Sequence, residues 1–558
     1  MERFKGIFMR TVILFLIVFA LIETLKAQPM RSAFINGKIY TVNEKQPIAE
    51  AVIVEENKII FVGSNDEAKK LIDNATNVVD LKGKLMLPGF IDNHVHFING
   101  GFYLLGIDLR PAKSTKEFKE ILKQYSQKNP EKWITGGYWD HEKWETKNLP
   151  TKEMIDEVVY NQPVFVERLD GHMGVANSYA LKLAGITKDT QSPEGGIIVK
   201  DPNTGEPTGV LKDNAMSLIY NIVPAPTEEE NYKAALAAFD EAKKLGLTSV
   251  QDITFDDQLE VYKKLKEEGK LTCRIYTRMP IAEYKKLVDQ NIQVGSGDEY
   301  IRMGSLKAFA DGSLGSSTAW FFNKYSQDTT TYGLPMDIIT DGSMDKWCKD
   351  ADLHHLQIST HAIGDRANAY MLDLYEKITK ENPKWDRRFR IEHAQHVRFQ
   401  DIPRFAELGV IASVQPYHCI DDGVWAEKRI GPERIKYTYP FKTFLDAGVK
   451  VCFGTDWYVA PLNPLLGLYA AVTRRTLDDK NPDGWIPEQK ISIEDAIKCY
   501  TINSAYASFE ENIKGSIEVG KLADLIVLSD DILTIDPVKI KDSEVVMTVF
   551  DGKVIYAK

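Results

Sequence analysis

The stretch Asp92-Asn93-His94-Val95-His96 follows a short apolar segment and places two histidines two positions apart. Successive side chains of a β-strand point to opposite faces, so His94 and His96 would share one face if this segment is a strand. The two imidazoles could then hold one metal ion, since imidazole is a common ligand of zinc and similar metals. A His-x-His pair alone is weak evidence, because such pairs are more often incidental.

Downstream of this pair, short apolar strands alternate with helical stretches. Besides the strand before His94, the strand candidates are 248–253, 273–278, 305–310, 358–361, 389–393, 411–416 and 450–454. Helices are expected at 231–245, 345–355, 371–380 and 493–500. Strands that alternate with helices indicate a parallel sheet. Eight such strands predict an α/β fold of the (β/α)8 TIM barrel type, here over residues 89–509.

One interval does not fit this rhythm, because the distance from His96 to Thr248 is too long for a usual barrel connection. We therefore expect an inserted subdomain at about 105–245. Insertions at the active face of a barrel usually shape the substrate pocket. Trp139 in this segment is accordingly a candidate substrate-binding residue, although tryptophan is also usual in hydrophobic cores.

The two ends of the chain resemble each other. Residues 31–88 and 510–558 both contain short alternating strands separated by turn signals. Asp551-Gly552 is a strong hairpin turn between two of them. We expect a small β-sandwich domain that is built from both ends and flanks the barrel.

The first 27 residues have the layout of a secretory signal peptide. A basic start with Arg3, Lys5 and Arg10 precedes an apolar run over 11–22, and the small residue Ala27 follows. The apolar run is short for a bilayer span, which needs about 20 residues. We expect a secreted or periplasmic protein, with an uncleaved membrane anchor as the alternative and no membrane partner beyond export.

The composition limits the possible partners. The chain has 69 basic and 80 acidic residues, a net charge of −11, which argues against nucleic acid as a partner. Its five cysteines are scattered without a Cys-x-x-Cys pair, so we expect buried, reduced residues. A homodimer is expected only from the prevalence of that state among oligomers.

Further polar residues close other expected strands. His361, His393 and Asp456 each stand where a strand turns into a loop, the position at which barrel enzymes carry their chemistry. Such shared placement is hard to explain by core packing. Lys307 lies on an apolar strand, where an unpaired ammonium group would be costly. It is therefore neutral, modified to a carbamate, or paired with a carboxylate such as Asp311; the residues alone leave these alternatives open.

A set of motifs resembles the amidohydrolase superfamily, and within it the amidohydrolase 3 branch that contains N-substituted formamide deformylase. The motifs are Asp-Asn-His-Val-His at 92–96, Leu-Lys-Ala-Phe-Ala-Asp-Gly-Ser-Leu-Gly-Ser-Ser-Thr-Ala at 306–319, His-Ala-Ile-Gly-Asp-Arg-Ala at 361–367, Arg-Ile-Glu-His-Ala-Gln at 390–395 and Gly-Thr-Asp-Trp at 454–457. The resemblance covers nearly the whole chain after the expected signal peptide, and this order of motifs is specific. It implies a metal-bearing barrel with a split β-sandwich.

The resemblance also implies a set of metal ligands. His94 and His96 would hold a first divalent ion, carbamylated Lys307 would bridge to a second, and that second ion would be held by His361 and His393. Asp456 would bind the first ion and act as the catalytic base. Zinc is the default for histidine and carboxylate ligands, although iron, manganese and nickel also fit, and one ion in place of two is an alternative.

A similar Asp-Gly-His stretch lies close to the pocket in that branch, so the resemblance makes His172 a candidate substrate-binding residue. The alternative is an ordinary turn histidine that precedes a helix capped by Asn177.

The implied activity is hydrolysis of a non-peptide C–N bond in a small-molecule amide, either an N-acyl or an N-formyl amide. A divalent metal lowers the pKa of bound water from about 15.7 to about 7, and Asp456 would take the proton and return it to the leaving nitrogen. The alternatives are deamination or cyclic amide hydrolysis on the same metals. From another class, a non-catalytic binding or scaffold protein could retain the barrel.

Overall fold

The computed structural model describes residues 31–130, 132–141, 144–146, 148–168, 173–193, 196–315 and 317–558. The expected signal peptide, residues 1–27, and the candidate His172 lie outside these ranges, so both remain predictions. In the ranges that are described, no helix combines the length and the apolar character needed to cross a bilayer.

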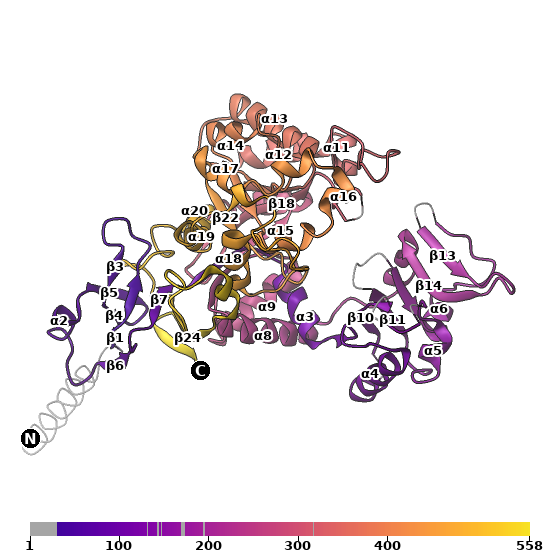
Figure 1. Ribbon diagram of the computed structural model, residues 1–558, viewed down its shortest axis with the longest axis horizontal. Coiled ribbons are helices and arrows are strands. Elements are labelled where there is room, and N and C mark those ends of the chain that lie inside the picture. Colours follow the sequence, from indigo (N-terminus) through magenta and orange to yellow (C-terminus); the bar gives the residue numbers. More distant parts are fainter. Residues whose placement is uncertain are drawn as a thin grey trace, which may run out of the picture.

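A parallel sheet of eight strands forms the centre of the molecule (Figure 1). In spatial order the strands are β8 (Phe90–Val95), β15 (Leu247–Ile253), β16 (Arg274–Pro280), β18 (Ile301–Phe309), β19 (Gln357–Ala362), β20 (Arg390–His393), β21 (Ile411–Val414) and β22 (Val451–Phe453). The sheet curls until its first and last strands meet. There the Asp456 N–H donates to the His94 carbonyl at 2.7 Å and the His96 N–H donates to the Trp457 carbonyl at 2.8 Å. The predicted TIM barrel is confirmed.

The barrel strands are buried along almost their whole length, because both faces of the sheet are covered. Helices of the outer layer connect them, among them α8 (Glu228–Lys244), α9 (Asp256–Glu267), α12 (Ser343–Leu353), α13 (Asp365–Glu381), α14 (Ile402–Leu408), α17 (Phe441–Asp446) and α19 (Ile493–Cys499). Helix α8 begins at a capping box between Thr227 and Glu230 and ends in Lys243-Lys244, as helix capping and the helix dipole favour. All five cysteines are buried and free, as expected.

Two smaller sheets, made from the ends of the described chain, pack face to face beside the barrel (Figure 1). The first contains β5 (Lys58–Gly63), β4 (Ala51–Glu55), β1 (Arg31–Ile35) and β6 (Asn77–Asp80). The second contains β25 (Lys553–Ala557), β24 (Val545–Phe550), β23 (Leu525–Leu528), β7 (Leu85–Pro88), β2 (Lys38–Tyr40) and β3 (Ile48–Ala49). Phe34 and Val52 of the first sheet share a core with Met86 and Leu525 of the second, as in a β-sandwich.

A third sheet follows helix α3 (Phe97–Leu105) and lies on the side of the barrel away from the sandwich (Figure 1). Its strands, in spatial order, are β13 (Gly196–Lys200), β14 (Pro207–Asp213), β12 (Met173–Ala176), β11 (Val164–Arg168), β10 (Ile134–Trp139) and β9 (Ile107–Asp108). Helices α4 (Thr115–Lys128), α5 (Lys152–Asp156), α6 (Ser178–Leu183) and α7 (Ser217–Tyr220) cover it, and Asn177 caps α6 as predicted. We call this module the insertion. Helix α8 falls inside the interval expected for it, but packs on α3 and β15 and belongs to the barrel layer.

Candidate metal centre

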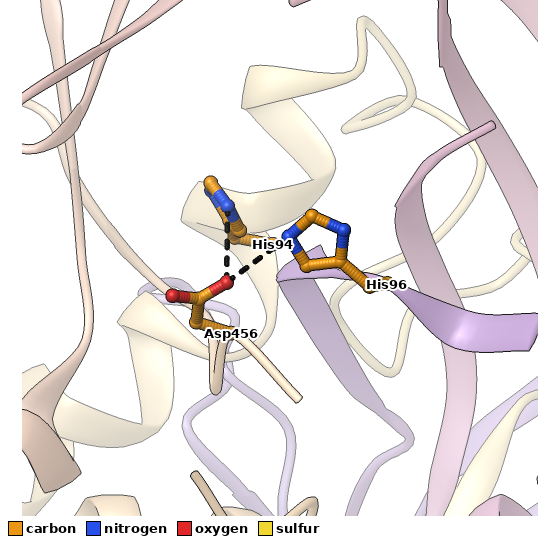
Figure 2. A group of neighbouring side chains, drawn as sticks. All are labelled: His94, His96 and Asp456. Atoms are coloured by element: carbon orange, nitrogen blue, oxygen red, sulfur yellow. Dashed lines mark ion pairs between the residues drawn. The ribbon is translucent and has the colours of Figure 1, made fainter. Parts of the chain in front are cut away.

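The carboxyl-terminal rim of the barrel brings His94, His96 and Asp456 together (Figure 2). The Asp456 Oδ1 atom lies 3.4 Å from Nε2 of His94 and 3.5 Å from Nε2 of His96. One ligand atom from each residue falls within 4.8 Å of the others, which is compatible with a shared metal ion. The two backbone hydrogen bonds that close the barrel fix these three residues relative to one another.

The remaining candidates surround this trio. Lys307 Nζ lies 3.4 Å from His94 Nε2, and the rings of His94 and His393 are 5.2 Å apart. The rings of His361 and His393 are 4.4 Å apart. Six residues from five separate segments of the sequence therefore lie close together on one rim.

His361 and Lys307 differ from the trio in their present partners. Nε2 of His361 lies 3.0 Å from the Gly312 carbonyl oxygen and 3.6 Å from Asp311 Oδ1. Asp311 itself accepts backbone N–H groups from Trp320, Ile363 and Gly364, and among the residues described it forms no ion pair with Lys307. The alternative in which Asp311 neutralises Lys307 is thus not what the structure contains.

His418 is a candidate that the sequence analysis missed. It lies on α15 (Pro416–Asp422), four residues beyond the end of β21, and its ring is nearly parallel to that of His393 at 6.3 Å. A ligand atom of His418 falls within 4.8 Å of one on His393 and one on Asp456. The buried Nε2 of His418 and Nδ1 of His393 have no hydrogen-bond partner among the described residues. Buried nitrogens of this kind are costly unless an ion, water or substrate satisfies them.

A buried carboxylate orients His94 from behind. Glu392 bonds to Nδ1 of His94, accepts the hydroxyl of Ser413 at 2.6 Å, and pairs with Arg278 and Arg390 at 3.0 and 2.9 Å. With Nδ1 engaged, Nε2 of His94 is left to face the cluster, as in the carboxylate–histidine pairs of metal sites. Burial opposes the charge of Glu392, but Arg390 and Arg278 hold its pKa well below the usual value.

The environment also sets the charges of the cluster. Burial, together with the positive charge of Lys307, lowers the pKa of His94 to about 3 and that of His361 to about 4. Burial lowers the pKa of Lys307 to about 7. Burial would raise the pKa of Asp456, but His94 and His96 hold it well below its usual value. Neutral imidazoles and an ionised carboxylate are the forms that bind a metal.

Two of the rim residues have a strained backbone. Asp456 has φ of 58° and His393 has φ of 69°, in the left-handed region that residues other than glycine rarely adopt. Each such residue costs about 1–3 kcal/mol, and they concentrate at functional sites. The fold therefore holds both side chains in place at a cost to its stability.

Trp139 lies in the interior of the insertion. Its side chain is fully buried in the core of the insertion beside Trp144, and its indole N–H donates to the Val166 carbonyl at 2.8 Å. This is the core role that the sequence left open beside the pocket role, so we assign Trp139 no contact with substrate.

Comparison with known proteins agrees with the fold. The family model described as Amidohydrolase family matches residues 77–556. Protein LONG AFTER FAR-RED 3 of Arabidopsis thaliana is 38% identical over 88% of this chain and 86% of its own length. YtcJ of Bacillus subtilis strain 168, which is named as an amidohydrolase, is 32% identical over 95% of this chain and 100% of its own.

Two further matches concern activity and structure. N-substituted formamide deformylase of Arthrobacter pascens is 26% identical over 94% of this chain and 98% of its own. A crystal structure from Pyrococcus horikoshii OT3, described as an uncharacterized metal-dependent hydrolase, superposes with a TM-score of 0.77. It is 30% identical and covers 91% of this chain and 99% of that one.

Proposed function

This chain belongs to the amidohydrolase family and is a metal-dependent hydrolase of C–N bonds, and on that premise we propose that it cleaves N-acyl or N-formyl amides of small molecules. The observation that carries the proposal is the convergence of His94, His96 and Asp456 on the rim of the barrel. Similarity to N-substituted formamide deformylase over nearly the whole chain supports the choice of amide.

We propose that His94, His96 and Asp456 hold one divalent ion. A second would be held by His361 and His393, with carbamylated Lys307 as a further ligand. The residues fit such ions, because burial lowers the pKa of His94, His361 and His393, and the pKa of Asp456 is held well below its usual value. A buried nitrogen of His393 also has no partner in the described chain. Zinc suits this mixture of imidazole and carboxylate ligands.

His418 is an alternative ligand for the second ion. One ligand atom of His418 lies within 4.8 Å of ligand atoms on His393 and Asp456. Nε2 of His361 is instead hydrogen-bonded to the Gly312 carbonyl. If a second ion binds, either His361 turns away from Gly312 or His418 takes its place. Replacing each with Asn and counting bound metal would separate the two arrangements.

Lys307 is suited to carbamylation, which we propose as its role. Its pKa of about 7 leaves a large fraction of the amine neutral at physiological pH. A neutral amine adds to carbon dioxide, forming an N–C bond and releasing a proton, and the product is a carboxylate. That group would replace a buried cation by an anion able to bridge two metal ions.

The proposed reaction adds water to the amide carbonyl and releases an acid and an amine. A divalent ion at this rim would acidify the attacking water and polarise the carbonyl oxygen. Asp456 would accept the water proton on its carboxylate, which the nearby imidazoles keep ionised, and then deliver it to the leaving nitrogen. Glu392 would keep Nε2 of His94 directed at the cluster throughout.

We also propose that residues 1–27 direct export and are removed. The basic start, the short apolar run and the small residue before position 28 support this proposal. Mass spectrometry of the mature chain from its native host would give a first residue near Gln28, whereas an intact N-terminus would contradict the proposal.

A substrate screen tests the proposed activity. The metal-loaded protein is offered N-formyl amides, N-acyl amides and cyclic amides, with His94→Ala as the inactive variant and the exposed His354→Ala as the matched control. We expect turnover of open-chain amides by wild type and by His354→Ala, and none by His94→Ala. If only cyclic amides are hydrolysed, the substrates are cyclic amides and not open-chain amides. If no amide is hydrolysed under any metal loading, the proposal is refuted.

A further inference from the structure

A series of tyrosine rings leads from the rim of the barrel into the insertion. The ring of Tyr458 lies 6.2 Å from His96, and Tyr103 of α3 is stacked on Tyr458 at 6.4 Å. Tyr138 of β10 follows at 5.4 Å from Tyr103. Tyr458 is 37% exposed, so this side of the candidate site is open to a ligand. The four aromatic residues form a continuous path from the proposed metal ligands to the insertion.

Glu167 of β11 stands at the far end of this path. The register of β10 and β11, which pairs Gly136 with Val166 and Trp139 with Arg168, places Glu167 beside Tyr138. Tyr220 packs on Phe165, which lies two residues before Glu167 on the same face of β11. Burial raises the pKa of Glu167. Besides burial, the negative charge of Glu167 raises the pKa of Tyr138 and Tyr220. Within the described ranges, Glu167 forms no ion pair with any Lys or Arg. A half-buried carboxylate with no cationic partner in the described ranges leaves part of its charge uncompensated.

The surroundings of Glu167 favour a cation. The faces of tyrosine rings attract positive groups, and they do so more strongly where water is excluded. The Tyr103 ring already attracts one cation, since the Arg110 guanidinium lies 4.8 Å from the centre of that ring. Arg110 is itself bound by both carboxylate oxygens of Asp108, at 2.7 and 2.8 Å, so Glu167 is not its partner. Among the described residues, no lysine or arginine forms an ion pair with Glu167, and a cationic ligand would match it.

We propose that Glu167, with Tyr103, Tyr138 and Tyr458, binds a cationic nitrogen on the amide substrate. The inference rests on the proposed function: the amide lies at the rim, and an ammonium or guanidinium group at the end of its substituent reaches Glu167. Glu167 is then a substrate-binding residue that selects amides of diamines or similar basic molecules over neutral ones. The carboxylate supplies the negative charge. The tyrosine rings exclude water, which strengthens the attraction between the carboxylate and the cation.

Matched formamides test this selection. N-(5-aminopentyl)formamide and N-hexylformamide have similar length and differ at the far end, where one carries an ammonium group and the other a methyl group. We expect wild-type holoenzyme to prefer the cationic amide by about tenfold in kcat/KM, and Glu167→Gln to remove that preference. The readout is the ratio of the two kcat/KM values within each protein, and circular dichroism checks that the variant is folded. The exposed Glu206→Gln, in the connection between β13 and β14 of the same module, is the matched control.

Binding gives a readout that does not need turnover. Calorimetry with hexylammonium should detect binding to wild type and to Glu206→Gln, weakened about tenfold in Glu167→Gln. Tyr138→Leu should weaken it as well, whereas Tyr138→Phe keeps the ring and should not. The inference would be overturned if Glu167→Gln lowered kcat/KM equally for both formamides. It would also be overturned if hexylammonium bound equally well to wild type and to Glu167→Gln. If neither formamide is hydrolysed but hexylammonium still binds and Glu167→Gln weakens that binding, only the proposed function is contradicted.

Discussion

The barrel rim and the insertion are built on opposite principles. At the rim, polar groups are buried: His94 is 1%, His393 4% and Asp456 7% exposed, and they are held by charged partners such as Glu392. The insertion has its own apolar cores on the two faces of its sheet, where Val166 packs on one side and Phe165 on the other. Most of its stability therefore comes from apolar burial, independent of the rim.

The difference separates chemistry from selection. The rim fixes a few side chains in place, two of them on strained backbone, and leaves buried imidazole nitrogens without a partner among the described residues. Such an arrangement suits one reaction. The insertion meets the rim through exposed or half-buried tyrosines and can change without disturbing the proposed ligands. Three predictions test this division of roles, in order of decreasing effect on catalysis.

The largest effect is expected at Asp456. Replacement by Asn keeps the size and removes the group that would accept and return the proton, so amide hydrolysis should fall by about 10²- to 10⁴-fold. Steady-state kinetics on one formamide would measure this, with circular dichroism to check the fold. Comparable activity in Asp456→Asn would mean that the chemistry does not depend on this part of the rim.

An intermediate effect is expected at Glu392. The change to Gln should weaken metal affinity or activity by about 10- to 100-fold, because the orientation of His94 is lost while every proposed ligand remains. Excess metal should restore part of the activity, which would not happen if Glu392 only stabilised the fold. The change also leaves Arg278 and Arg390 short of a buried counter-charge, so a lower thermal midpoint is expected.

The smallest effect on catalysis is expected in the insertion. Trp139→Ala should destabilise that module by about 3–5 kcal/mol, since it empties a large buried site. Hydrogen exchange should rise in β10 and β11 and stay unchanged in β19 and β20. Turnover of a small neutral formamide should change much less than in Glu392→Gln. Loss of turnover equal to that of Asp456→Asn would mean that the two regions are not separable.

The eight barrel strands were predictable because each is an apolar run and sequence alone reveals such runs. The positions of His361, His393 and Asp456 followed from them, because a parallel barrel collects the ends of its strands on one rim. The split sandwich was predictable for a similar reason: the alternating strands and the Asp551-Gly552 turn are local signals, and that turn does join β24 to β25.

Other features depend on contacts between distant residues and could not be read from the sequence. Glu392 stood inside a quoted motif, but its partners Arg278 and His94 are far away in the chain. His418 follows the seventh strand, yet it lies on helix α15, beyond the strand ends at which ligands of a barrel are expected. Trp139 suited a pocket and a core equally, and only the packing of the insertion decided between them.

The central claim is that the rim holds a divalent metal on which C–N hydrolysis depends. The most direct test removes metal from the protein with a chelator and returns zinc stepwise while bound metal and amide hydrolysis are both measured. The account predicts inactive metal-free protein and activity that rises with occupancy and levels off at one or two equivalents, with no such recovery in His94→Ala. Full activity in metal-free protein, or equal zinc binding and recovery in His94→Ala, would contradict it.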